Sequence, residues 1–119
     1  HAGIAKPADV GDVKVPKATG PDARTVAEIV DKKAALNNKP VLVRGKVVKY
    51  TPGVMGKNWI HLQDGSGSPA DGTNDVLVTT KDETKIGAVV VARGTVRTDV
   101  DLGSGYFYKV LVDEAKLQK

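Results

Sequence analysis

The sequence contains no cysteine, which excludes disulfide bonds, thiol nucleophiles and cysteine-based zinc sites. Aromatic residues make up only 4% of the chain, with one Trp and one Phe, so each ring needs an explanation. No apolar run approaches the roughly 18 residues that a membrane-spanning helix needs. With 119 residues, of which 40% are hydrophobic and 27% charged, the composition is typical of one globular domain with a single core.

The first residue is His1 rather than methionine. Such a start is typical of a chain from which a signal peptide has been cleaved, and also of a trimmed chain. The residues that follow contain no tag-like repeat. We therefore expect an exported protein, periplasmic or extracellular.

Residues 1–23 are predicted to form an extended or flexible arm, because prolines and glycines interrupt them and no apolar periodicity develops. Val13 and Val15 alternate with Lys14, which favours one short extended segment. Such a segment could add a strand to a sheet edge of this subunit or of a neighbour. The arm is thus a candidate for oligomer formation.

The domain proper is predicted over 24–119 and begins with a helix at about 25–36. Thr25 can cap the first turn, and Glu28 three residues later completes a capping box. Asparagines followed by Pro40 end the helical pattern.

From residue 40 the apolar period changes from 3.6 to 2, which predicts strands over about 40–117. Two of them contain an interior glycine, Gly45 and Gly94, where a small barrel would bend. Five short strands of this spacing favour a barrel over a sandwich. The expected strands cover residues 40–50, 59–63, 75–80, 88–97 and 106–112.

Three segments carry a family resemblance: Val-Arg-Gly-Lys-Val at 43–47, Trp-Ile-His-Leu-Gln-Asp-Gly-Ser-Gly at 59–67, and Val-Ala-Arg-Gly-Thr-Val at 91–96. In this order, after a helix, they resemble the OB-fold superfamily, both its nucleic-acid-binding domains and its small exported bacterial members. The resemblance covers roughly 25–117. It implies a mainly β fold, a five-stranded Greek-key OB-type barrel preceded by one α-helix. It does not fix the ligand, since OB barrels bind many unrelated ones.

Ligands of OB barrels usually bind on the outer face of strands two and three. If Ile60 and Leu62 point inward, alternation places Trp59 and His61 on that outer face. Two interpretations of Trp59 stay open at this point. Its ring is either an exposed surface on which bases stack, or a half-buried ring that holds down the loop 52–57.

Basic residues are concentrated in the stretch 41–60, which holds four of them and no acid. This is as much positive charge as the net +4 of the chain, and it favours an anionic partner. The alternative is a solvated strand face on which basic side chains pair weakly with Asp99, Asp113 or Glu114. The predicted ligand-binding residues are Trp59, His61, Tyr50, Lys46, Lys49, Lys57, Arg44 and Tyr106.

Metal sites have weaker support. Oxygen-bearing side chains surround the Gly/Ser-rich loop after residue 63, as a calcium loop would, but their spacing matches no EF-hand. An N-terminal histidine could chelate copper through its amine and imidazole. The weak metal candidates are Asp64, Asp71, Asp75 and His1.

No nucleophile with a plausible base and orienting acid is present, so we expect a non-enzyme without a cofactor. The leading hypothesis is a binding module for an anionic polymer, single-stranded nucleic acid first. One alternative is a structural subunit that forms oligomers or filaments through its arm. The other is a periplasmic accessory protein that handles a metal or a small ligand.

Overall fold

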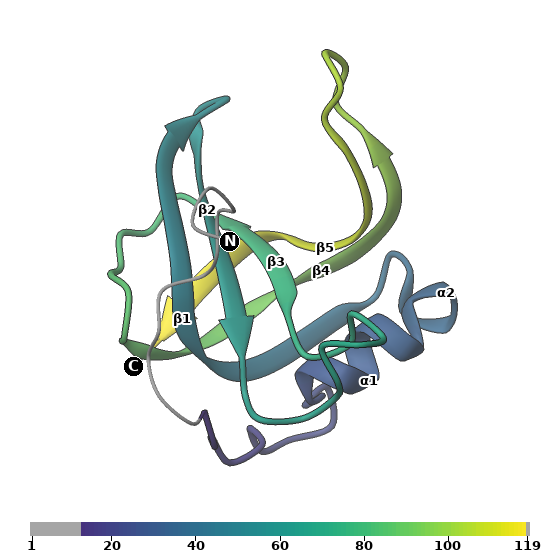
Figure 1. Cartoon of the computed structure of the whole chain (residues 1–119), viewed down its shortest axis with the longest axis vertical. Helices are drawn as coiled ribbons and strands as arrows, with labels where there is room; N and C mark the ends of the chain where they lie inside the picture. The colour runs from purple at the N-terminus through teal and green to yellow at the C-terminus, as the bar shows by residue number, and fades with distance from the viewer. Residues whose placement is uncertain (1–12, 119) are drawn as a thin grey trace.

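The computed structural model describes residues 13–118 of the chain. Its five strands form a closed sheet in the order β1-β2-β3-β5-β4, so that β4 pairs with β1 (Figure 1). This confirms a mainly β chain with a closed five-stranded sheet after a helical segment. The elements are α1 (Val26–Asp31), α2 (Lys33–Leu36), β1 (Pro40–Val54), β2 (Lys57–Gln63), β3 (Val76–Thr80), β4 (Val89–Asp101) and β5 (Phe107–Gln118).

Closure of the sheet depends on one parallel pair of strands. β3 and β5 run parallel, with Val78 opposite Val112, whereas the other neighbouring strands are antiparallel. None of the helices within 13–118 combines the length and apolar character needed to cross a membrane.

The predicted helix is present as two short pieces. Thr25 and Glu28 form the expected capping box, in which the Thr25 side chain accepts from the Glu28 N–H and the Glu28 carboxylate accepts from the Thr25 N–H. Lys32, with φ −104° and ψ 23°, departs from helical geometry and separates α1 from α2. Asn38 has a positive φ of 68°, the left-handed conformation that asparagine tolerates after a helix.

The main core fills the closed sheet and is covered at one end by the helical segment. Val26, Ile29 and Leu36 from the helices are buried in it together with the inward side chains of the strands. Full burial of an aliphatic side chain contributes about 1.5–3 kcal/mol. The helical segment therefore stabilises the sheet by completing its interior.

The two glycines predicted to bend the long strands lie at close approaches between strands. A Cβ atom on Gly94 would stand 2.7 Å from Val112 Cγ1, and one on Gly45 would stand 3.0 Å from Leu62 Cβ. Glycine is therefore needed at these positions because a larger residue would push neighbouring strands apart.

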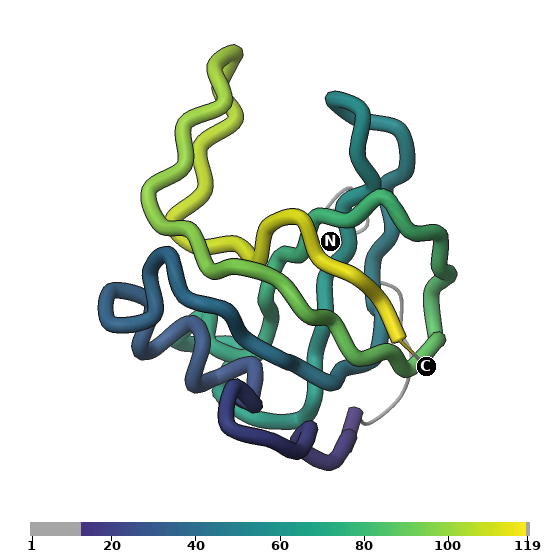
Figure 2. Tube along the Cα trace, turned by 180° about the vertical axis from the view of Figure 1, so that it is seen from behind, coloured from purple at the N-terminus to yellow at the C-terminus, as the bar shows by residue number. Residues whose placement is uncertain are grey.

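Two hairpins are longer than predicted and project on the same side of the sheet (Figures 1 and 2). The segment 52–56, expected as a loop, continues the β1–β2 ladder until Val54 pairs with Lys57. Met55 and Gly56 both have positive φ, as a two-residue type I′ turn requires. The β4–β5 hairpin likewise extends to the pair Asp101 and Phe107. These hairpins form the walls of the candidate site.

The described part of the predicted arm, 13–23, lies against its own chain. Val15 N–H donates to the Asp64 carbonyl at 3.1 Å, although residues 13–15 form no strand. Ala18 and Ala23 are buried together with Val91. Residues 1–12 of the predicted arm fall outside the described residues.

Candidate ligand-binding cleft

A cavity of about 200 Å³ lies over the outer face of β2 and β3, between the two projecting hairpins. We call it the hairpin cleft. Its lining combines aromatic, basic and small polar side chains. They are Lys49, Thr51, Val54, Trp59, His61, Leu77, Tyr106 and Tyr108.

Trp59 forms the floor of the hairpin cleft and is only 7% exposed. The interpretation of this ring as an exposed stacking surface is therefore wrong. Its Nε1–H donates to the Val54 carbonyl at 2.8 Å, so the indole holds the β1–β2 hairpin against the sheet, as the alternative interpretation described. Trp59 packs outside the closed sheet with Leu77 and Leu111 rather than in the main core.

The second hairpin is fixed to the same floor. Tyr108 packs on Trp59 with ring centroids 5.4 Å apart and planes tilted by 37°. Val54 and Val100 add apolar contacts from the two hairpins. Tilted aromatic pairs add about 0.5–1.5 kcal/mol to the burial of their area. The Trp59 cluster therefore sets the distance between the hairpins.

Four of the predicted ligand-binding residues meet at the hairpin cleft: Trp59, His61, Lys49 and Tyr106. Lys49 is exposed, and the Tyr106 side chain, 40% exposed, stands at the rim on the β4–β5 hairpin. Both are therefore accessible from solvent.

Tyr50 and Arg44 are placed elsewhere. A register shift between Val47 and Lys49 lets Val47 and Val48 both be buried, which changes the side-chain alternation of β1. Lys49 then lines the hairpin cleft, and Tyr50 packs against the main core. Tyr50, which is partly buried, therefore lies outside the hairpin cleft in which it was expected.

Arg44 and Lys46 stand earlier on β1. Arg44 donates to the carbonyls of Pro16 and Lys17, at 3.3 and 3.2 Å, and so holds the arm rather than a ligand. Lys46 pairs in register with Gln63 and Val89 and does not line the hairpin cleft. Neither residue belongs to the site that was predicted around Trp59.

Lys57 forms an ion pair beside the hairpin cleft. Its Nζ lies 3.2 Å from one Asp113 carboxylate oxygen, and Arg97 Nε lies 3.3 Å from the other. Thr79 donates its hydroxyl to the same carboxylate at 2.6 Å. Burial raises the pKa of Asp113, but the hydrogen bonds from Thr79 and Lys57 and the charge of Arg97 outweigh it, so this pKa lies below its ordinary value. The charge of Lys57, one of the four cations predicted to bind a ligand, is thus partly offset within the protein.

The His61 ring is held in a fixed orientation at the hairpin cleft. Its Nδ1 lies 2.6 Å from Asp75 Oδ1, and Gln63 donates its side-chain amide to Asp75 Oδ2 at 3.1 Å. Asp75, a weak metal candidate from the sequence, therefore orients the imidazole.

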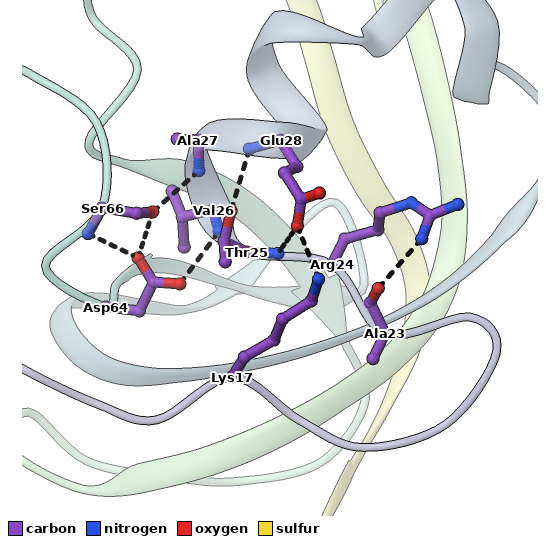
Figure 3. A network of polar contacts seen from close by, with 9 residues as sticks. All are labelled: Lys17, Ala23, Arg24, Thr25, Val26, Ala27, Glu28, Asp64 and Ser66. Carbon is purple, nitrogen blue, oxygen red and sulfur yellow. Dashed lines mark hydrogen bonds and ion pairs between the residues drawn. The ribbon is translucent and has the colours of Figure 1, made fainter.

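Asp64 is used to cap a helix. Its Oδ2 accepts from the Val26 N–H at 3.0 Å, and its Oδ1 accepts from the backbone and hydroxyl of Ser66 (Figure 3). The Ser66 Oγ accepts in turn from the Ala27 N–H at 3.0 Å. These contacts leave the 6%-exposed carboxylate committed to the first turn of α1.

The other metal candidates gain no ligand set from the fold. Asp71 is exposed in a turn of the β2–β3 loop. Within residues 13–118, no group of three or more His, Asp or Glu side chains is arranged to hold a metal ion. His1 falls outside this range.

Sequence reasoning missed half of the cleft lining. Tyr108 follows Tyr106 at a period of two, which could have shown that both rings face the same side of the hairpin. The contribution of Leu77 had no signal, because β3 is buried on both faces. Also missed were two exposed apolar residues of the β4–β5 hairpin, Leu102 and Phe107.

A larger cavity of about 440 Å³ lies beside the link between β3 and β4. Its walls contain Asp82 and Glu83 against the single base Lys85, with no aromatic residue. This cavity therefore offers neither an aromatic stacking surface nor a net positive charge, whereas the hairpin cleft offers both.

Comparison with models of known protein families and with curated protein sequences finds no match for this chain.

Proposed function

We propose that this protein is a non-enzymatic OB-type binding module that holds an anionic polymer, single-stranded nucleic acid first, in the hairpin cleft. The strand order β1-β2-β3-β5-β4 and the parallel β3–β5 pair support the OB-type assignment. In that fold, the outer face of strands two and three and the hairpin loops on either side form the usual ligand surface.

One observation carries the choice of ligand: Tyr106, Tyr108, His61 and Lys49 share one solvent-open cleft. Single-stranded nucleic acid is held by aromatic rings that stack on bases and by cations that pair with phosphates. In this arrangement Tyr106 stacks on a base and Lys49 contacts a phosphate. Trp59, being buried, supports the stacking rings from below.

The experiment is a fluorescence anisotropy titration with a labelled single-stranded oligothymidine at several salt concentrations. Tyr106→Ala is expected to weaken binding by about 1–3 kcal/mol, the usual effect of removing one stacking ring. Lys49→Ala should lower the slope of log affinity against log salt by about 1.

Lys39→Ala is the matched control, since Lys39 is exposed just before β1 and lies outside the hairpin cleft. Its affinity should stay close to that of the unchanged protein. Undetectable binding at low salt, or an affinity that does not respond to salt, would reject the proposed function.

A further inference from the structure

The imidazole ring of His61 is held at one nitrogen, and its other nitrogen is available to a ligand. Asp75 holds Nδ1 at 2.6 Å, and Gln63 holds Asp75 in turn. Among residues 13–118, the other ring nitrogen, Nε2, has no hydrogen-bond partner. The ring lines the hairpin cleft and its side chain is 32% exposed. A ligand in the cleft therefore meets a nitrogen whose orientation is already set.

The carboxylate determines which form of the ring is favoured. Because Asp75 can only accept when ionised, Nδ1 carries a proton, and Nε2 is an acceptor in the neutral ring. Protonation of Nε2 makes the ring a cation that donates from both nitrogens. In that form Nδ1–H stays on the Asp75 carboxylate, and Nε2–H is the donor left for a ligand.

The other groups that face His61 do not change charge where histidine does. In register, Lys49 of β1 and Leu77 of β3 flank His61, and Tyr106 and Tyr108 come from the β4–β5 hairpin. Lysine and tyrosine side chains ordinarily titrate near pH 10, well above the range of histidine. Histidine is the residue type in the lining of the hairpin cleft whose ordinary pKa lies between about pH 5 and 8.

We propose that His61 determines ligand specificity in the hairpin cleft by donating Nε2–H to an anionic oxygen of the ligand, so that binding takes up one proton. This inference rests on the proposed function and identifies the contacted group as a phosphate. Asp75 is a positioning residue, because it acts through the imidazole rather than on the ligand.

The sign of the pH effect follows from this proton uptake. An anionic ligand favours the protonated ring, so the affinity gain is full at acidic pH and is lost as pH rises through the titration of the complex. At constant ionic strength, we expect oligothymidine affinity to fall about tenfold between pH 5.5 and 8.0, as for the loss of a charge-assisted hydrogen bond.

Two variants test the assignment by anisotropy with the same oligothymidine. His61→Gln keeps a polar side chain but cannot become a cation, so its affinity should be nearly independent of pH over this range. Asp75→Asn should weaken oligothymidine binding at pH 5.5, because the imidazole loses the carboxylate that orients its ring. Lys39→Ala should keep the unchanged protein's profile.

The outcomes separate the inference from the function on which it rests. If oligothymidine binds with a pH-independent affinity, or if His61→Gln keeps the pH dependence, His61 has no such role and the cleft can still bind nucleic acid. If oligothymidine fails to bind at any pH, the proposed function fails and this inference fails with it.

Discussion

The helical segment covers one end of the closed sheet, and the two hairpins project from the other (Figures 1 and 2). The polar side chains at these two ends have different roles. At the helix end, the oxygens of Asp64 and Ser66 accept from backbone N–H groups of α1, and Asp64 also accepts from the Ser66 hydroxyl. At the hairpin end, Lys49 and Tyr106 stand on the walls of an open cleft. Polar side chains that accept hydrogen bonds from backbone N–H groups thus have a structural role. Polar side chains without such bonds are available to a ligand.

Among the substitutions that test this comparison, Trp59→Ala is expected to cause the largest loss of stability. Removing the buried ring should destabilise the protein by about 3 kcal/mol, because the floor between the hairpins loses its packing. Urea denaturation measures this loss.

Trp59→Phe is the matched variant, since it keeps an aromatic ring but removes the hydrogen bond to Val54, worth about 1 kcal/mol, together with a smaller part of the packing. Unchanged stability in Trp59→Ala, combined with lost oligonucleotide binding, would restore the exposed stacking role that the structure contradicts.

A smaller loss, about 2 kcal/mol, is expected from Asp64→Ala, because the backbone N–H groups of Val26 and Ser66 lose their acceptor while the Thr25 cap remains. Chemical denaturation gives the size of this loss, and oligothymidine affinity should stay unchanged. Asp71→Ala in the same loop removes an exposed carboxylate and should change stability by less than about 0.5 kcal/mol. Equal effects of the two substitutions would remove the distinction between the two aspartates.

The smallest effect is expected from a substitution of Glu28. The backbone N–H of Thr25 and the nearby Lys17 ammonium stabilise its carboxylate and lower its pKa to about 2. Its stabilising contribution is present above the ordinary pKa of 4.5 and is lost as pH falls towards 2. Glu28→Gln should cost about 1 kcal/mol at pH 7 and should flatten the loss of stability between pH 4.5 and 2. Thermal melts across this range test it, and an unchanged acid profile would argue against the capping role.

Much of the fold could be predicted from the sequence because its signals are local. The period-2 pattern located the strands, Thr25 and Glu28 marked the helix start, and Gly45 and Gly94 marked the close strand crossings. The hairpin lengths were missed because backbone ladder pairing extends beyond the side-chain alternation.

The site was less predictable because it depends on contacts between distant segments. The bulge in β1 reverses which side chains face outward, so Tyr50 turned inward and Lys49 outward. Asp64 accepts from the first turn of a helix that begins 38 residues earlier in the chain, and no local sequence pattern indicates that contact. Trp59 is buried by hairpins whose length was itself not predicted.

The most direct test of the central claim is a two-dimensional ¹H–¹⁵N NMR titration of the protein with oligothymidine. We expect the shifted amide signals to come from the walls and floor of the hairpin cleft, residues 49–61 and 100–108, while those of Asp64 and Ser66 stay in place. Shifts concentrated at the β3–β4 link, residues 81–88, or at the α1 end instead would contradict this account.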